Sequence, residues 1–545
     1  MSFLQSAPQL PHPLDQDGVL QSCLQRALGA QQRAALENDL RALADYAMMA
    51  FARRQTMRRE EPILTQWGAW GRRLDRVELS SSWREGPDIT TRHALVASGY
   101  DTHPTARLEQ FARVYLYHMA SEFYTCPLAM TDGAASAIRA SGNDALIKRV
   151  LPHFLSRDAD TLWLSGQWMT ENIGGSDVSH TETRARRDAD GQWRLYGRKW
   201  FTSAIVGECA LALARPDEGH GLALFFVQTR DADGAWLGLT VDRLKDKLGT
   251  RELPTAEIHL DGVPAWPLGD LEHGVRQIAP MLGITRTWNA VCAVSHMARS
   301  IALARDYAQR RQAFGKPLID QPAHARTLAD MQAEFEGAFA LSFEVTHLLG
   351  HVENGAGEDH EAALLRLLTP LAKLWTGKLA VSIASEALEC FGGNGYIEDT
   401  GLPQLLRDAQ VYPIWEGTTN VLSLDLLRAF SASGITPFRQ HVETLLAAAP
   451  ADQAEPIRQA LGRCEALLDK TANDSSRLQG LARGLAISLA RIMAAALLWR
   501  QAHWDSAQSH GDARSAAALR RFMAHGLLHL DEAEDNDIRT LTTNF

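Results

Sequence analysis

The sequence predicts an α+β protein in which one β-rich region interrupts a largely helical chain. At 545 residues the chain is too long for one hydrophobic core. Apolar residues recur with helical spacing at both ends, whereas the middle holds short β-branched and aromatic runs between turn signals. We therefore expect a helical domain at 1–160, a β domain at 161–270, a helical bundle at 271–432 and a further helical domain at 433–545.

The first region, residues 1–160, is rich in Ala, Leu and Arg. Helical spacing is clear in LQRALGAQQRAALENDLRALADYAMMAF and in LEQFARVYLYHMASEF. Pro62 and the stretch SSWREGPD (81–88) break that pattern. The first residues show no basic segment followed by an apolar one, so we expect no signal peptide and a cytoplasmic protein.

The second region contains QWRLYGRKWFTS, GLALFFVQT, LGLTVDRL and PTAEIHLDGV. These runs have strand composition, and DADG (188–191) and RDADG (230–234) separate them as turns would. The order predicts an antiparallel meander or barrel.

Helices return after about residue 274. The segment 286–311 has no Pro or Gly, which suits a long bundle helix, and a second long helix ends at Gly392. SASGITP (431–437) is typical of a linker, and 438–530 is helical again. The most apolar run, 485–499, contains Arg491 and indicates a buried helix rather than a membrane span.

Charge and cysteine content exclude several classes of protein. The formal net charge of −10 argues against binding of nucleic acid through overall positive charge. The six cysteines form no CxxC pair, which argues against a disulfide framework or zinc ribbon, and we expect no metal site.

Residues 391–420 gather glycines and one glutamate that suggest a site. Glycines can turn tightly or approach a ligand closely, and Glu416 stands between Trp415 and Gly417. A carboxylate in an apolar pocket can act as a base near neutral pH. The alternative is a helix C-cap at Gly392-Gly393 with an ordinary loop glutamate.

Five stretches in a fixed order resemble the acyl-CoA dehydrogenase family of flavoproteins. They are WMTENIGGSDV (168–178), KWFTS (199–203), RRQAFGKPL (310–318), ECFGGNGY (389–396) and IWEGTTN (414–420). Each match alone is weak, but five in order across about 250 residues favour the resemblance strongly. It implies FAD as cofactor and an acyl-CoA or similar thioester as substrate.

The resemblance also implies roles for individual residues. Glu416 would remove the α-proton, and the flavin N5 would receive the hydride. Ser176, Arg286 and Gly417 would contact substrate. The residues implied to contact FAD are Met169, Thr170, Gly175, Ser176, Trp200, Phe201, Thr202, Arg311, Phe314, Gln321, Gly392, Gly393, Trp415, Thr418 and Asn420.

Some relatives carry the base on the long helix, one residue before an arginine. Here that position is Thr285, before Arg286, and a threonine is no base, so Glu416 is the matching carboxylate. Gly283 replaces an aspartate that contacts CoA in several relatives, and Asn172 replaces a proline. We expect a short, branched acyl-CoA as substrate.

The FGGxGY-like loop reaches the FAD of a neighbouring subunit in the family, which implies a homotetramer built as two dimers. An electron-transferring flavoprotein is the implied electron acceptor, and no membrane partner is expected.

The long C-terminal extension and KDKLGTR (245–251) resemble the AidB branch, which is associated with the response to DNA alkylation. An alternative function is therefore a DNA-associated protein with weak or no dehydrogenase activity, binding double-stranded DNA through residues 433–545. This extension has 12 Arg and Lys against 13 Asp and Glu. Its candidate DNA-contacting arginines are Arg491, Arg500, Arg514, Arg520 and Arg521.

Overall fold

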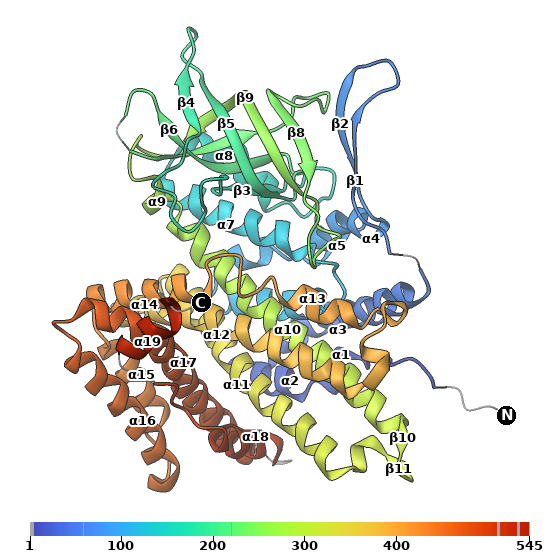
Figure 1. Cartoon of the computed structure of the whole chain (residues 1–545), viewed down its shortest axis with the longest axis vertical. Helices are drawn as coiled ribbons and strands as arrows, with labels where there is room; N and C mark the ends of the chain where they lie inside the picture. Colours follow the sequence, from blue (N-terminus) through green and yellow to red (C-terminus); the bar gives the residue numbers. More distant parts are fainter. Residues whose placement is uncertain (1–4, 58, 220, 509–512, 531–534, 544–545) are drawn as a thin grey trace.

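The computed structural model describes residues 5–57, 59–219, 221–508, 513–530 and 535–543. A β domain lies at one end of the molecule, a long helical body lies below it, and the last helices pack against one flank of that body (Figure 1). The α+β class with an additional C-terminal helical unit is therefore confirmed.

Helices dominate the N-terminal part of the chain. They are α1 (Pro13–Gln16), α2 (Gly18–Ala27), α3 (Ala30–Thr56), α4 (Ser81–Arg84), α5 (Gly86–Arg92), η1 (Ala97–Tyr100), α6 (Ala106–His118), α7 (Thr125–Ser141) and α8 (Asp144–Phe154).

One element of this part was not expected. A hairpin of β1 (Ile63–Trp67) and β2 (Arg73–Glu78) rises beside the β domain (Figure 1). Gln66 and Arg73 each donate a 2.9 Å hydrogen bond to the Val241 carbonyl. The break in helical pattern at Pro62 thus begins a hairpin that is fastened to the second domain.

The β domain is a seven-stranded, mainly antiparallel sheet. Its strands are β3 (Ser165–Trp168), β4 (Arg184–Arg187), β5 (Trp193–Ser203), β6 (Cys209–Pro216), β7 (Ala223–Gln228), β8 (Leu239–Leu244) and β9 (Thr255–Pro267). β6 pairs with both β4 and β7, and β9 pairs with β5 and β7, so the sheet closes on itself as a barrel. Two pairings, β3–β6 and β4–β6, are parallel, unlike the purely antiparallel arrangement that we expected.

Long helices form the third part. Its helices are α9 (Gly274–Gln277), α10 (Ala279–Arg310), α11 (Pro322–Glu353), α12 (Asp359–Cys390), α13 (Pro403–Ala409) and α14 (Thr419–Ser433). Its short elements are β10 (Gln312–Ala313), β11 (Lys316–Pro317), η2 (Leu318–Asp320), η3 (Gly392–Gly395) and η4 (Glu398–Thr400). α10 packs on α7, α11 and α12 and so joins the bundle to the N-terminal helices.

The last helices are α15 (Thr436–Leu445), α16 (Ala451–Lys470), α17 (Ser475–Ser506), α18 (Ala513–Ala524) and α19 (Asp535–Thr543). α17 is long and apolar enough to cross a membrane by length and composition, but 78% of its most apolar window is buried in the protein. It packs against α11, α12 and α14, as a core helix does (Figure 1).

Candidate active site

A cavity of about 980 Å³ lies where the β domain meets the helices. The residues that line it come mainly from the loop after β3, the end of β5, the β8–β9 loop, α7, α10, α12 and the segment 411–428. Most of its wall is apolar. A large apolar cavity with a few converging polar groups is the usual form of a ligand site.

Glu416 lies in this cavity wall, between α13 and α14. Its backbone has φ of 58°, an uncommon left-handed conformation for a residue with a Cβ, and Gly417 follows with φ of 106°. The Glu416 side chain accepts a 2.6 Å hydrogen bond at Oε2 from the Thr285 hydroxyl. Thr285 therefore orients the carboxylate, a contact that the sequence alone did not reveal.

Two basic side chains, one partly and one fully buried, hold the backbone around Glu416. Arg286 Nε donates to the Glu416 carbonyl at 3.2 Å, and Lys373 Nζ donates to the Gly417 carbonyl at 2.5 Å. Lys373 belongs to α12 and is fully buried, and burial lowers the pKa of its ammonium to about 7 despite the nearby Glu416. These bonds explain how the strained backbone is maintained.

Asp425 completes the charge network on α14. It pairs with Arg286 at 2.8 Å and with Arg366 at 2.7 Å. Burial opposes ionisation of Asp425, but the hydrogen bond from Arg366 and the charges of both arginines bring the pKa of Asp425 below its ordinary value. Arg286 is thus fixed between α14 and the Glu416 backbone.

The loop after β3 brings Met169, Thr170, Gly175 and Ser176 to the cavity. A Cβ at Gly175 would lie 2.6 Å from the Thr170 hydroxyl oxygen, so the turn requires glycine there. The predicted loop residues are therefore gathered at one side of the cavity.

Glu171 anchors this loop and was missed as a site residue. Its carboxylate accepts from Lys199 at 2.7 Å and from Thr183 Oγ1 at 2.6 Å. Burial opposes ionisation of Glu171, but the Lys199 charge and these hydrogen bonds bring its pKa below the ordinary value. The sequence signal that was available is an acidic residue inside the WMTENIGG stretch together with the lysine of KWFTS in β5.

Of the three residues expected on β5, only Phe201 lines the cavity, together with Ser203, which was not expected. Phe201 and Ser203 line the cavity, whereas Trp200 and Thr202 are absent from the described lining. Thr202 is buried and donates to the Ala256 carbonyl at 2.7 Å.

Trp200 lies under the ammonium of Lys245, 3.4 Å from the ring centroid. The cause is strand alternation, because a one-residue difference in register exchanges the two faces of a strand. The β5–β9 register also shifts between Lys199 and Thr202. Phe201 and Ser203 thus occupy the position that the sequence comparison gave to Trp200 and Thr202.

Trp415, Gly417 and Thr418 line the cavity beside Glu416, as Arg286 does. Asn420 is exposed in the first turn of α14 and lies outside the described lining.

The remaining predicted residues lie far from the cavity. Arg311 caps α10, 25 residues after Arg286, which corresponds to about 37 Å along the helix axis. Phe314 is 98% exposed at the tip of the β10–β11 hairpin, whose backbone Gln321 braces with a 2.8 Å hydrogen bond to the Ala313 carbonyl.

Gly392 and Gly393 are exposed at the same end of α10. The turn that contains them follows Phe391, which packs on Tyr307 near the end of α10 at 5.1 Å between ring centroids. The predicted cofactor residues therefore form two groups, one in the cavity and one at the opposite end of α10.

The cavity group fits FAD, the cofactor of the family that the sequence resembles. Two buried polar atoms in its wall, Gln167 Oε1 and Trp415 Nε1, lack a hydrogen-bond partner among the described residues. A buried polar atom needs a hydrogen-bond partner, and a bound cofactor is one group that supplies it. The glycine turn at Gly175 and the flat ring of Phe201 suit the close approach of a planar ring system.

Family models match almost the whole chain. The acyl-CoA dehydrogenase middle domain matches residues 166–263, and the acyl-CoA dehydrogenase C-terminal domain matches 272–430. The N-terminal domain of the adaptive response protein AidB matches 9–161, and an acyl-CoA dehydrogenase 11 C-terminal domain-like model matches 435–543.

Individual relatives agree. Acyl-CoA dehydrogenase family member 11 of Caenorhabditis elegans is 40% identical over 94% of this chain and 87% of its own. The putative acyl-CoA dehydrogenase AidB of Escherichia coli is 35% identical over 68% of this chain and 69% of its own.

Solved structures extend the similarity to three dimensions. Caenorhabditis elegans ACDH-11 in complex with C11-CoA has a TM-score of 0.94 and 37% identity, covering 100% of this chain and 97% of that one. The apo form of Bd2924 has a TM-score of 0.85 and 40% identity, covering 92% and 100%. This chain belongs to the acyl-CoA dehydrogenase family, in the branch that contains AidB and ACDH-11.

Proposed function

We propose that the protein catalyses α,β-dehydrogenation of an acyl-CoA thioester, with Glu416 as the base that removes the α-proton. The observation that carries this proposal is the Glu416 carboxylate, which is held by Thr285 in the wall of the cavity that Met169 and Ser176 also line. When bound, FAD supplies the acceptor for the hydride that leaves the β-carbon.

The protein's own groups account for the proton transfer. The Thr285 hydrogen bond limits rotation of the Glu416 carboxylate, so that the free oxygen is available to the substrate. The bonds from Arg286 and Lys373 fix the adjoining peptides, and the Glu416 N–H is the candidate donor to the thioester oxygen.

The length of the acyl chain is a separate question. Phe123, Cys126, Met130 and Cys292 line the cavity on the helical side and give it an apolar wall. We expected a short, branched chain, whereas ACDH-11, at 37% identity, was crystallised with C11-CoA. We propose that the apolar wall accepts the acyl chain, and a series from short branched chains to C11 distinguishes the two lengths.

We further propose that the chain acts as a homotetramer built from dimers. Arg311, Phe314, Gly392 and Gly393 lie too far from the cavity to meet a cofactor bound there in the same chain. We propose that these four residues, at the C-terminal end of α10, contact the cofactor bound to a partner subunit. Analytical ultracentrifugation of the wild type tests this proposal, because a monomeric protein would contradict it. A Phe314→Ser variant that remains tetrameric and keeps FAD would contradict the role of this end of α10 at the partner's cofactor. The electron acceptor that we propose is an electron-transferring flavoprotein.

The alternative function, binding of double-stranded DNA through residues 433–545, has less support than the dehydrogenase, because most of the candidate DNA-contacting arginines are already paired. Of its five candidate arginines, four pair with carboxylates of α11: Arg491 with Glu334, Arg500 with Glu344, Arg514 with Glu336 and Arg521 with Asp330. These arginines fasten the extension to the bundle. Retention on double-stranded DNA that falls steeply with salt would support the alternative, and no retention at low salt would remove it.

Anaerobic flavin reduction tests the dehydrogenase. The FAD-loaded protein is mixed with acyl-CoAs ranging from short branched chains to C11, and flavin absorbance is followed in wild type and Glu416→Gln. Fast bleaching that is lost in the variant, while the FAD content stays equal, is the expected result. Bleaching of the variant at the wild-type rate would reject Glu416 as the base, and no bleaching with any acyl-CoA would reject the activity.

A further inference from the structure

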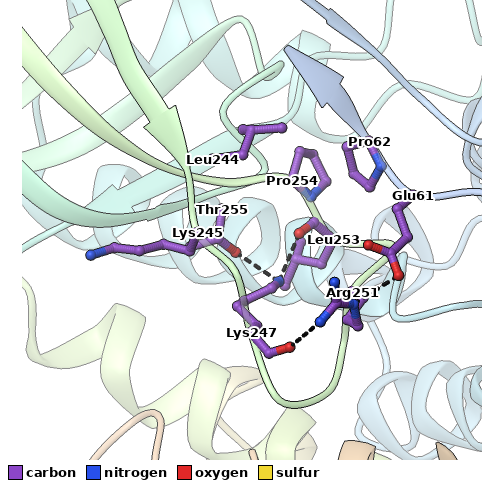
Figure 2. A pocket seen from close by; sticks show the side chains of 9 residues that line it. All are labelled: Glu61, Pro62, Leu244, Lys245, Lys247, Arg251, Leu253, Pro254 and Thr255. Carbon is purple, nitrogen blue, oxygen red and sulfur yellow. Dashed lines mark hydrogen bonds and ion pairs between the residues drawn. The ribbon is translucent and has the colours of Figure 1, made fainter.

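Lys247 lies in the loop between β8 and β9 and borders two spaces. It lines the large cavity and also an adjoining pocket of about 40 Å³, with Leu253, Thr255 and Arg251 (Figure 2). Its Nζ donates to the Leu253 carbonyl at 2.7 Å and to Thr255 Oγ1 at 3.1 Å. The ammonium is therefore directed inward rather than to solvent.

A second hydrogen bond continues from Thr255 to the cavity. Thr255 and Ser203 are opposite each other in the β5–β9 pairing, and their hydroxyl oxygens are 3.1 Å apart. Ser203 lines the cavity two residues after Phe201. The three side chains thus form a relay from Lys247 to the cavity wall.

Elementary chemistry gives this relay a direction. An ammonium has donors and no acceptor, so Thr255 Oγ1 must accept from Lys247. Donation from a cation makes the Thr255 oxygen a poorer acceptor and its hydroxyl a stronger donor, which favours donation from Thr255 to Ser203 Oγ. In that arrangement the proton of Ser203 is free to point into the cavity.

We propose that Lys247 and Thr255 are positioning residues that make the Ser203 hydroxyl a hydrogen-bond donor to the bound flavin. The oxidised flavin ring carries nitrogen atoms that accept hydrogen bonds, and reduction increases the negative charge on the ring. A donor directed at the ring, with a cation behind it, stabilises the reduced form more than the oxidised form. The relay raises the reduction potential of the flavin.

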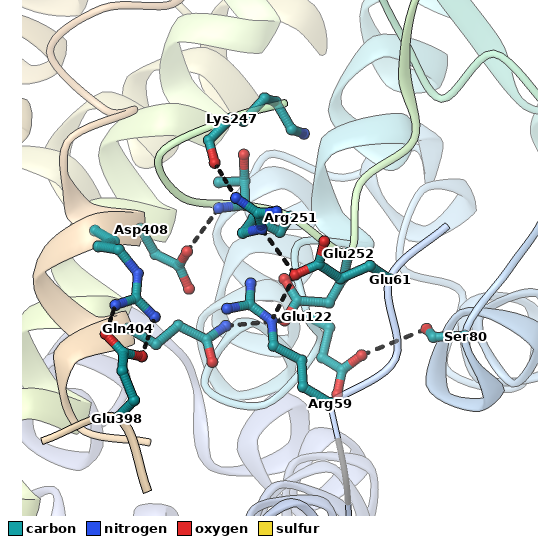
Figure 3. Close-up of polar contacts among 12 residues, drawn as sticks. Arg59, Glu61, Ser80, Glu122, Lys247, Arg251, Glu252, Glu398, Gln404 and Asp408 are labelled. Atoms are coloured by element: carbon teal, nitrogen blue, oxygen red, sulfur yellow. Dashed lines mark hydrogen bonds and ion pairs between the residues drawn. The ribbon is translucent and has the colours of Figure 1, made fainter. Parts of the chain in front are cut away.

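The surroundings of the loop keep Lys247 in place. Gly249 packs so closely on α13 that a Cβ there would lie 2.3 Å from the Arg407 carbonyl oxygen. The Thr250 N–H donates to Asp408 at 2.6 Å, and Arg251 binds Glu61 at 2.7 Å and the Lys247 carbonyl at 2.9 Å (Figure 3). The loop is tied to both the bundle and the N-terminal part.

The charge state of Lys247 makes the relay sensitive to pH. Burial lowers the pKa of Lys247 to about 8, and Arg251 acts in the same direction, against Cys126, Glu252 and Asp408. The ammonium therefore predominates at pH 7 and is lost as the pH rises through 8. Neutral lysine can accept a hydrogen bond from the Thr255 hydroxyl, so donation from Thr255 to Ser203 is no longer favoured.

The test is the reduction potential of the FAD-loaded protein, measured against dyes without any acyl-CoA, so that it does not depend on the proposed dehydrogenation. Lys247→Met removes the cation, Thr255→Val the link and Ser203→Ala the final donor. Each change should lower the reduction potential at pH 7. The expected shift corresponds to a roughly tenfold weaker binding of reduced relative to oxidised flavin, which is the effect of losing one charge-assisted hydrogen bond. The effect of Lys247→Met should shrink by pH 9.

A double variant and a matched control make the test decisive. Lys247→Met with Ser203→Ala should change the potential no more than Ser203→Ala alone, because the lysine acts through the serine. Lys148→Met, on the exposed surface of α8, should leave the potential unchanged. Additive effects in the double variant, or a wild-type potential in both Lys247→Met and Thr255→Val, would overturn the proposal. Thr255→Val is nearly isosteric and carries the test if Lys247→Met does not fold.

Discussion

The hydroxyl of Thr285 donates a 2.6 Å hydrogen bond to the carboxylate of Glu416, across 131 residues of sequence. Thr285 holds the position where some relatives carry the base on the long helix. In this chain Thr285, on α10, orients the carboxylate of Glu416, which lies in the segment before α14. Both residues line the same cavity.

Removing the Thr285 hydroxyl should slow proton abstraction without abolishing it. In Thr285→Val the carboxylate loses a partner that fixes its rotamer, and we expect the rate of flavin reduction to fall about tenfold. Thr285→Ser keeps the hydroxyl and should restore most of the rate. Stopped-flow reduction at saturating acyl-CoA measures both. Equal rates in the valine and serine variants would show that the hydrogen bond has no part in the reaction.

Lys373 should make stability depend on pH in the alkaline range. The pKa of Lys373 is about 7 in the folded protein and 10.5 in its ordinary state, so between these values the unfolded chain binds more protons. Folding stability contributed by this group therefore rises with pH from about 7 to 10.5 and is lowest below 7, by up to about 1.4 kcal/mol per pH unit.

Lys373→Met removes this dependence. We expect the free energy of unfolding of wild type relative to Lys373→Met to increase between pH 7 and pH 9, as measured by denaturant titration. Lys378→Met, an exposed residue of the same helix, is the matched control and should give a constant difference. A wild-type curve parallel to that of Lys373→Met would contradict the prediction.

The sequence predicted the order of helical and β regions because periodicity and turn residues are local signals. It missed the β1–β2 hairpin, which depends on Gln66 and Arg73 binding the backbone of β8, far away in sequence. The motif stretches identified Glu416 and the 168–178 loop, and the fold brings both to one cavity. The stretches included Phe201 but could not tell that Ser203, rather than Trp200 and Thr202, shares its cavity face, because one-residue register is decided by pairing with β9.

Contacts between distant residues also escaped the sequence. The arginines of α17 and α18 suggest a basic surface when read alone, yet their partners are carboxylates of α11. Nothing local in the sequence pairs them. Likewise, Lys373 and Thr285 become site residues only when α10 and α12 are folded against the segment before α14.

Arg491 and Glu334 should be essential for attaching the C-terminal extension. The Arg491 guanidinium binds both carboxylate oxygens of Glu334, at 2.7 and 3.0 Å, and both side chains are largely buried. In Arg491→Met the carboxylate is left without this partner, and we expect a loss of roughly 3–5 kcal/mol in unfolding free energy.

The control for this pair is Arg520→Met, because Arg520 is an exposed residue of α18. It should change stability by less than about 0.5 kcal/mol. A double variant, Arg491→Met with Glu334→Leu, should recover part of the loss, since it leaves no unpaired charge. Recovery is measured by denaturant titration, and a double variant less stable than either single one would contradict this account.

Asp408 should make the free energy of unfolding depend on pH in the opposite direction to Lys373. It is buried and accepts the Thr250 N–H at 2.6 Å (Figure 3). Burial raises the pKa of Asp408 to about 6, and the neighbouring Glu252 acts in the same direction. Because 6 lies above the ordinary value of 3.8, the folded protein binds more protons than the unfolded chain between these values. Stability contributed by Asp408 is thus present below about 3.8 and is lost as the pH rises to 6.

Asp408→Asn should therefore stabilise the protein at neutral pH. Asparagine keeps an oxygen for the Thr250 N–H and carries no charge, so the cost of burying a carboxylate near Glu252 disappears. We expect a higher melting temperature than wild type at pH 7 and a much smaller difference at pH 4.5, where the carboxyl group of the folded wild type is protonated. Asp408→Ala removes the oxygen as well and should be less stable than Asp408→Asn at both values. If Asp408→Asn were less stable than wild type at pH 7, the carboxylate would be a net stabilising partner of the loop, contrary to this prediction.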